Sequence, residues 1–421
     1  MNIAQTTFRL RDQMRRFLGN LSTRQTAWRF CLESLYGIVT RQSLRLTEIA
    51  RALSEDIALR KTVERLSRQA GREGLHETIE EHVIQTGAHR IGEETLLVLD
   101  LSDLSKPHAR AMEYLAQVRD GSEGTITRGY WLGQVVGVPC GGSEITPLVN
   151  RLWSQAAPDF ESENLEILGC VDAVNRHVDG RGVWVIDRGG DRGNLFYPLL
   201  ERGLEFVVRL RGDRHLVHRG RRHLASDLGA RCRLRFRDVV IRQSRGGKER
   251  RVVLDYGACK VRLPNSEQPL WLVVIRGFGD DPMLLLTTRP LTASRRSQWW
   301  VVEAYLTRWR IEDTLRFAKQ SFQFEDVRVR GYQSLRNLMA LALLAMYFVM
   351  VWMGRATRLD VLTHHALEAS RRLFGIPDFL YYALADGLKE ILQKAKTRPF
   401  QRNPRRPPPD PQLDLFELSS T

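Results

Sequence analysis

Two short apolar runs, each followed directly by an aspartate, constrain the fold of this chain more than any other sequence feature. Residues 95–99 (TLLVL) precede Asp100, and residues 183–186 (VWVI) precede Asp187. Consecutive apolar residues, several of them β-branched, predict strands that are buried on both faces. Because ligands bind outside the carboxyl ends of strands in α/β sheets, both aspartates are candidate functional residues.

Each aspartate also has a purely structural interpretation. An acidic residue that follows a strand commonly caps a helix or forms a turn. Asp103 and Asp191 lie close behind Asp100 and Asp187 and could be the caps instead. We prefer Asp100 and Asp187 because they lie nearest the ends of the predicted strands, and Asp191 is the substitute if the register of the second strand differs.

The surrounding pattern predicts an α/β core in a chain that is α+β overall. Further strands are predicted at residues 130–138, 144–150 and 206–210, and helices at 161–178 and after Asp191. With the two apolar runs, the order is strand, strand, strand, helix, strand, helix, strand.

Changes of pattern divide the chain into six segments. Residues 1–88 have helical periodicity with Arg and Lys on the polar faces, which fits a helical DNA-binding domain and a solvated helical bundle about equally. The other boundaries are 89–210 for the first part of the core, 211–290 for an inserted β-rich domain, 291–350 for the last part of the core, 351–396 for a C-terminal helical region and 397–421 for a flexible tail.

The charge of the chain favours a polyanionic partner. Lys and Arg number 64 against 49 Asp and Glu, for a formal net charge of +15, and the basic residues occur along most of the 421 residues. Arg side chains neutralise phosphates with bidentate geometry, so double-stranded DNA is the expected partner. The alternative is a basic protein whose charge serves solubility alone.

Other features argue against metal-thiolate sites and membranes. Five cysteines lie far apart and form no CxxC pair, which disfavours a zinc ribbon or a disulfide framework. The N-terminus has no continuous apolar stretch, so we expect a cytoplasmic protein. Residues 338–353 are apolar but only 16 long, which is short for a membrane span and predicts a buried core helix.

A third carboxylate lies in a predicted helix with a distinctive polar face. Tyr305, Arg308, Glu312 and Lys319 are separated by 3, 4 and 7 positions, which places all four on one side of a helix. An ordinary solvated polar stripe remains the alternative. Three carboxylates are hard oxygen ligands that suit Mg²⁺, and paired Mg²⁺ ions activate a nucleophile and stabilise a leaving oxygen at a phosphodiester.

The same four residues carry a resemblance to a known family. Tyr305, Arg308, Glu312 and Lys319 match the YREK signature of bacterial insertion-sequence DDE transposases, and the strand order resembles the RNase H-like catalytic fold of those enzymes. The resemblance implies that Asp100, Asp187 and Glu312 are catalytic and bind two Mg²⁺ ions, for which Mn²⁺ would substitute. It also implies a β domain inserted before the Glu312 helix.

The resemblance implies further partners and contacts. The reaction would be metal-dependent cleavage at the ends of an insertion sequence and strand transfer into target DNA, by a homodimer that holds two DNA ends in the bacterial nucleoid. The residues expected to contact DNA are Tyr305, Arg308, Lys319, Arg188 and Trp309. Trp299, Trp300 and Trp309 are candidates for holding a flipped base, although tryptophans in such segments are more often part of the core.

The tail contains a short motif that resembles the pentapeptide by which bacterial proteins bind the DNA polymerase sliding clamp. The motif is QLDLF, formed by Gln412, Leu413, Asp414, Leu415 and Phe416. An extended arm that ends in apolar anchors suits insertion into a preformed pocket. The alternative is a tail segment that packs back on the body of the protein.

Two other functions fit parts of the sequence. A DNA-end-binding protein derived from such an enzyme would bind without cutting, and its mark would be a missing carboxylate, which this sequence does not show. An RNase H-like nuclease, such as a junction resolvase, would share the fold and the metals but would not need the YREK face or the inserted β domain.

Overall fold

The computed structural model describes residues 3–19, 21–119, 124–243, 249–354, 364–366, 368–369, 380–394 and 399–400. The sequence begins with helices, as predicted for residues 1–88. They are α1 (Ile3–Phe17), α2 (Gln25–Arg41), α3 (Leu46–Leu53), α4 (Leu59–Ala70) and α5 (Leu75–Gly87), followed by the short η1 (Ala88–Arg90). Their apolar residues recur at helical spacing and point inward: in α3, Leu46, Ile49 and Leu53 are all buried.

A ten-stranded mixed sheet forms the centre of the molecule. Its strands are β1 (Thr95–Ser105), β2 (Ala116–Arg119), β3 (Ile126–Pro139), β4 (Thr146–Trp153), β5 (Val183–Ile186), β6 (Glu205–Arg209), β9 (Phe236–Gln243), β10 (Glu249–Val261), β11 (Leu270–Arg276) and β12 (Met283–Thr287). The order across the sheet is β2, β3, β1, β5, β6, β12, β11, β10, β9, and β4 also pairs with β3.

The strand directions confirm the predicted fold class. β1 pairs antiparallel with β3, β3 pairs antiparallel with β4, and β1, β5 and β6 are parallel to one another. Helix α6 (Glu163–Val178) connects β4 to β5, and helix α7 (Gly193–Glu201) connects β5 to β6. The core is therefore a mixed sheet of the RNase H-like arrangement flanked by helices, with the short strand β2 added to the predicted order.

The two faces of the sheet have separate apolar cores. Leu97, Leu99 and Ile186 pack with residues of α6 and α7 on one face. Val98 and Val185 point the opposite way, as neighbours in a strand must, and join a cluster that includes residues of α9 (Arg295–Thr307), α10 (Arg310–Phe322) and α11 (Tyr332–Met350). Side chains of α9 and α10 therefore approach the sheet from the second face.

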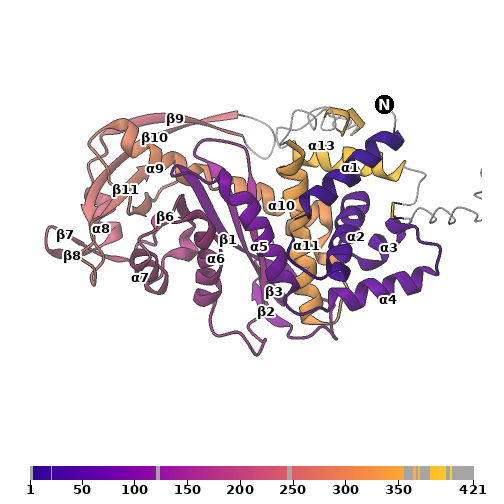
Figure 1. Ribbon diagram of the computed structural model, residues 1–421. Helices are drawn as coiled ribbons and strands as arrows, with labels where there is room; N and C mark the ends of the chain where they lie inside the picture. The colour runs from indigo at the N-terminus through magenta and orange to yellow at the C-terminus, as the bar shows by residue number, and fades with distance from the viewer. Residues whose placement is uncertain are drawn as a thin grey trace, which may run out of the picture.

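Strands within residues 211–290 extend this sheet. β12 pairs with β6, and β11, β10 and β9 follow in order, all antiparallel. A hairpin of β7 (His215–His218) and β8 (Arg221–Leu224) and the short helix α8 (Ala225–Arg231) lie before them in the chain. Figure 1 shows these elements at one end of the molecule and the N-terminal helices at the other.

Helix α11 packs the N-terminal helices against the central sheet. It is apolar along its length, with a mean hydropathy of 1.3 over 18 residues, and 83% of that window is buried in the protein. It contacts α5, α2, α4 and β4, and Figure 1 shows it between the N-terminal helices and the sheet. The prediction of a buried core helix here is confirmed. The short η3 (Phe324–Asp326) precedes α11, η4 (Trp352–Gly354) follows it, and α13 (Tyr381–Gln393) packs against α2.

Candidate active site

The register of the sheet places Asp100 and Asp187 side by side. β1 and β5 pair in parallel up to Leu99 and Ile186, so the two aspartates follow the last pair on neighbouring strands. The prediction that a strand ends at Leu99 is wrong, because antiparallel pairing with β3 continues to Ser105. Asp100 therefore lies inside β1, at the point where β1 loses its parallel neighbour.

The chain turns sharply after Asp187. The Asp187 carboxylate accepts a hydrogen bond from the backbone N–H of Gly189 at 2.7 Å and caps the short helix η2 (Arg188–Gly190). A Cβ atom on Gly190 would lie 2.6 Å from the Ile186 side chain, so this position has no room for a larger residue. The two glycines thus keep the Asp187 carboxylate close to the end of β5. Asp187 itself is the cap of the short helix, a role for which the sequence also offered Asp191.

The expected single helix of the YREK motif is two helices. Tyr305 belongs to α9, Glu312 and Lys319 belong to α10, and Arg308 lies at the junction. Backbone N–H groups at the junction, including those of Ile311 and Glu312, bond to the carbonyls three residues earlier, which tightens the turn. The junction turns the Arg308 side chain toward β1.

Arg308 connects the carboxylates that the sequence singled out. One guanidinium nitrogen lies 3.3 Å from Asp100 Oδ2 and the other lies 3.0 Å from Glu312 Oε1. The guanidinium also lies over the Tyr305 ring, 5.6 Å from its centroid. The Arg308 side chain is 9% exposed, and its Nε atom is buried without a hydrogen-bond partner in the described part of the chain. Two carboxylates from distant parts of the sequence thus share one buried cation.

The charges of the three carboxylates act on one another and on Arg308. Burial is the largest cause that raises the pKa of Asp100 to about 6; the charges of Asp187 and Glu312 act in the same direction, and Arg308 opposes them. Burial lowers the pKa of Arg308, but the charges of Asp100, Tyr305, Glu312 and Asp187 outweigh burial and raise it. The single Arg308 guanidinium therefore compensates only part of the negative charge of Asp100, Asp187 and Glu312.

The other residues expected to contact DNA have different surroundings. Arg188 is exposed at the turn after Asp187. Lys319 is paired with Asp103 on β1, with 3.6 Å between Nζ and Oδ1. Tyr305 is buried, so its hydroxyl is not at the surface, and its ring instead packs against Arg308.

The tryptophans considered for base stacking have aromatic or cationic neighbours. Trp309 lies edge-on to Phe278 at 6.1 Å, Trp299 packs on Tyr256 at 5.6 Å, and the Arg289 guanidinium lies 3.9 Å from the centre of the Trp300 ring. All three are partly buried. Trp309 follows Arg308 directly and is the one nearest the carboxylates in sequence.

Asp191, the substitute for Asp187, has a structural environment. Its carboxylate accepts hydrogen bonds from the Arg211 backbone N–H and the Arg214 side chain, both at 2.6 Å, and its side chain is 1% exposed. A carboxylate with both oxygens occupied is poorly placed to bind a ligand. The geometry therefore favours Asp187 over Asp191.

The sequence suggests only a capping role for Asp103, but the structure gives Asp103 a different environment. It lies inside β1, is buried and pairs with Lys319. The apolar residues at 99, 101 and 104 in the continuing sequence LDLSDLS indicate that a strand could extend past Asp100. A longer strand would have placed Asp103 beside the helix that carries Lys319.

The chemistry of the donor set fits a hard divalent cation. Asp100, Asp187 and Glu312 offer only carboxylate oxygens, which suit Mg²⁺ and Mn²⁺ rather than zinc. Their mutual repulsion at Asp100 is of the kind that a bound cation relieves. Within the residues that the structure describes, no group of three His, Cys, Asp or Glu side chains is gathered closely enough to bind a metal ion, and Arg308 lies between Asp100 and Glu312.

Comparison with known proteins finds a family match for part of the chain. Residues 164–348 match the family described as Transposase DDE domain. The matched segment runs from α6 into α11 and includes Asp187, Arg308 and Glu312 but not Asp100. No curated protein sequence matches the chain. Among solved structures, a cryo-EM structure of the piggyBac transposase synaptic complex with hairpin DNA aligns with 93% of this chain and 80% of that chain, at 13% identity and a TM-score of 0.43.

Proposed function

We propose that this protein is a DNA transposase that cleaves DNA at the ends of an insertion sequence and transfers the released strands into target DNA. The observation that carries the proposal is that Arg308 pairs with both Asp100 and Glu312 while Asp187 follows the strand next to Asp100, in a chain whose residues 164–348 match the Transposase DDE domain family. The basic charge of the chain supports DNA as the substrate.

In this proposal the three carboxylates hold two Mg²⁺ ions, for which Mn²⁺ substitutes. Divalent ions supply charge stabilisation at the scissile phosphate and activation of a water or 3′-hydroxyl nucleophile. Asp187 contributes from the strand end with one oxygen already fixed by Gly189. Glu312 contributes from the first turn of α10, and its side chain is half exposed, so it is the most accessible of the three to substrate.

The cations around the carboxylates are proposed to bind the DNA backbone. Arg188 is exposed beside Asp187 and would contact a phosphate directly. Arg308 is paired with Asp100, and Lys319 is paired with Asp103. When another cation neutralises these carboxylates, both basic side chains would be free to bind phosphates. Tyr305 would support Arg308 by packing, and Trp309 would stack on a base near the cut.

The finer features of the proposal come from the resemblance to bacterial YREK transposases. We propose a cut-and-paste reaction in the bacterial nucleoid, by a homodimer that brings two DNA ends together. Docking on the polymerase sliding clamp through Gln412, Leu413, Asp414, Leu415 and Phe416 is part of the same proposal, although this motif lies outside the residues that the structure describes.

The test compares Mg²⁺-dependent cleavage by the wild type and by Glu312→Gln, on a DNA fragment carrying the inverted repeats expected to flank the coding region. The substitution keeps the shape of the side chain and removes its charge. We expect the wild type to release 3′-hydroxyl ends, and the variant to bind DNA but cut at least about a thousandfold more slowly. Asp313→Asn is the matched control, because Asp313 lies next to Glu312 but pairs with Arg316 instead.

Two outcomes would replace the proposal. If both proteins bind DNA and neither cuts it with Mg²⁺ or Mn²⁺, the protein is a DNA-end-binding protein rather than an enzyme. If the wild type cuts branched or unrelated DNA equally well and transfers no strand, it is an RNase H-like nuclease.

A further inference from the structure

A cavity lined by basic side chains lies at the far end of strand β1. The cavity has a volume of about 630 Å³, and its walls are the segment that follows β1 and the segment between η3 and α11. Four of its lining residues are basic (Lys106, Arg110, Arg328 and Arg330) and two are acidic (Glu325 and Asp326). The cavity therefore carries a net positive charge, and His108 adds to it when protonated.

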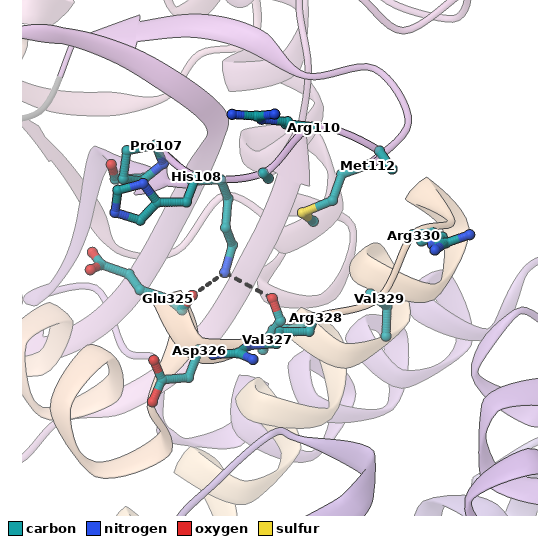
Figure 2. Close-up of a pocket in the computed structure, with 14 residues that line it drawn as sticks. Pro107, His108, Arg110, Met112, Glu325, Asp326, Val327, Arg328, Val329 and Arg330 are labelled. Carbon is teal, nitrogen blue, oxygen red and sulfur yellow. Dashed lines mark hydrogen bonds between the residues drawn. The ribbon is translucent and has the colours of Figure 1, made fainter.

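The walls of this cavity are fixed at one end by Lys106. The Lys106 side chain is buried and donates hydrogen bonds to the carbonyls of Phe324 and Val327, each at 3.1 Å, and to the carbonyl of Glu325. Figure 2 shows the bonds to Glu325 and Val327 as dashed lines across the cavity floor. A lysine has three donors, so Lys106 is fully occupied and acts as a brace.

The opposite end is fixed by Glu113. Its backbone N–H donates to the Arg330 carbonyl at 2.9 Å, and its carboxylate accepts from the Tyr332 N–H at 2.8 Å. The Tyr130 hydroxyl donates to the Glu113 carbonyl at 2.6 Å. The two walls are thus held at both ends, and the cavity is preformed rather than a gap between loose loops.

The charges inside the cavity are separated. In Figure 2, Arg110 and Arg330 lie on one side with Met112 between them, and Glu325 and Asp326 lie on the other. Arg110, Arg328 and Arg330 are exposed, and within the described residues no carboxylate lies within ion-pair distance of their side chains. Unpaired guanidiniums that line a preformed cavity are suited to bind phosphate oxygens.

The cavity and the candidate active site lie along the same strand, β1. β1 carries Asp100 at the carboxylate cluster and Ser105 in the cavity wall, and five residues of strand span about 17 Å. Between them, Lys319 of α10 pairs with Asp103 of β1. A DNA strand that passes from the carboxylates along β1 would reach the cavity about five base steps away, at about 3.4 Å per step.

We infer that this cavity binds backbone phosphates of the DNA strand on one side of the cleavage point, through Arg110 and Arg330. The inference rests on the proposed function for its ligand, because it assigns the cavity to the same DNA. Met112 and Val329 would contact the sugar, and Glu325 and Asp326 would keep phosphates on the arginine side. The cavity would hold the DNA in register for cleavage and would read no base sequence.

The experiment measures the salt dependence of DNA binding by the full chain. The probe is a fluorescent 30-base-pair duplex of random sequence, with KCl as the variable and without divalent ions. Loss of two phosphate contacts in the Arg110→Gln/Arg330→Gln double variant should lower the slope of log Kd against log salt by about 2 and weaken binding by about tenfold to a hundredfold near 0.1 M salt. Within the described part of the chain both arginines lack side-chain partners, so the variant should fold normally, which circular dichroism will check.

A control variant makes the result specific. Arg221→Gln removes an exposed arginine of the β7–β8 hairpin, which lies at the other end of the molecule, and should leave the slope unchanged. An unchanged slope in the double variant, or an equal decrease in Arg221→Gln, would overturn the inference.

Cleavage assays separate this inference from the proposed function. If the wild type cleaves DNA and the double variant keeps the wild-type slope, the cavity inference fails and the transposase proposal stands. If the double variant loses slope but the wild type never cleaves, the cavity binds DNA in a protein that does not cut. On a cleaved substrate, a single methylphosphonate about five steps from the cut should weaken binding by the wild type but not by the double variant.

Discussion

Arg308 and Lys106 are both buried cations beside strand β1, but their positive charges are compensated in different ways. Arg308 faces two carboxylates, Asp100 and Glu312, whose charges raise its pKa despite burial. Lys106 faces three neutral backbone carbonyls, and burial lowers its pKa to about 8.

The difference separates a functional cation from a structural one. Ionic partners can be exchanged, because a metal ion or a phosphate can take the place of either member of an Arg–carboxylate pair. Backbone carbonyls cannot leave their positions without unfolding, so a lysine bound to them holds two chain segments together. β1 therefore carries an exchangeable site near its middle and a rigid brace at its end, and the following substitutions test that division.

The largest effect is expected for Arg308→Gln. Removing this cation leaves Asp100 and Glu312 with uncompensated negative charge, which should lower the free energy of unfolding by about 4 kcal/mol without metal. Mg²⁺ at about 100 times its Kd should return about 2.7 kcal/mol, because a bound ion replaces the missing charge. Thermal unfolding with and without Mg²⁺ measures both.

The metal response is the decisive part of this comparison. Mg²⁺ should raise Tm more in Arg308→Gln than in the wild type, because in the variant no guanidinium at position 308 competes for the carboxylates. Arg316→Gln on the same helix, where the arginine is exposed, is the control and should change stability by less than about 0.5 kcal/mol. A variant as unstable with Mg²⁺ as without it would show that the carboxylates do not bind metal.

Lys106→Met should have the next largest effect. Two of the three hydrogen bonds that it makes are fully buried, so their carbonyls would be left without a donor, and we expect a loss of about 3 kcal/mol. In contrast to Arg308→Gln, this loss should be the same with and without Mg²⁺. Chemical unfolding of both variants, side by side, measures the difference. If Mg²⁺ restored the stability of Lys106→Met, the distinction between a functional cation at Arg308 and a structural one at Lys106 would be wrong.

Asp100→Asn should act in the opposite direction. The folded protein raises the pKa of Asp100 from 3.8 to about 6, so it binds the proton more tightly than the unfolded chain does. Stability from this group is present below about pH 4 and is lost as the pH rises through 6. Asparagine removes that loss, so the metal-free variant should be more stable at pH 7 by about 3 kcal/mol. Its unfolding free energy should vary less between pH 4 and 6 than that of the wild type.

The Asp100→Asn variant should be more stable but should also fail to cleave DNA. Carboxylates that repel one another lower the stability of the free protein, yet the same carboxylates are needed to bind the ligand. Equal stability of variant and wild type at pH 7 would mean that Arg308 fully compensates Asp100. In that case the cluster would have no excess negative charge for a metal ion to relieve.

The sequence predicted those parts of the site that depend on local pattern. The runs before Asp100 and Asp187 were buried strands, and parallel pairing of those strands brings the aspartates together. The full length of β1 was missed because it depends on pairing with β3, which is a long-range contact. The break between α9 and α10 has no Gly or Pro to mark it, so helical spacing alone could not reveal that Arg308 turns toward β1.

The position of residues 211–290 relative to the core was also beyond local pattern. Alternating apolar residues predicted strands there, and the strands are present. Which edge a strand joins is determined by distant partners, and here β12 pairs with β6 and adds four strands to the central sheet. A sequence pattern can indicate a strand, but it does not specify the neighbour of that strand.

The smallest effect is expected for Asp191→Asn. This variant tests whether Asp187 or Asp191 is the functional aspartate after β5. The substituted side chain would keep one acceptor for the Arg211 N–H but lose the ionic contact with Arg214, so stability should fall by about 1 kcal/mol. Because Asp191 lies outside the Arg308 cluster, DNA cleavage should remain within about threefold of the wild type at a temperature where both are folded. Asp187→Asn should abolish cleavage with little loss of stability, since an asparagine can still accept the hydrogen bond from Gly189. If the two variants show the reverse pattern, Asp191 is the second metal-binding carboxylate, and the side chain of Arg214 must leave it before a metal ion can bind.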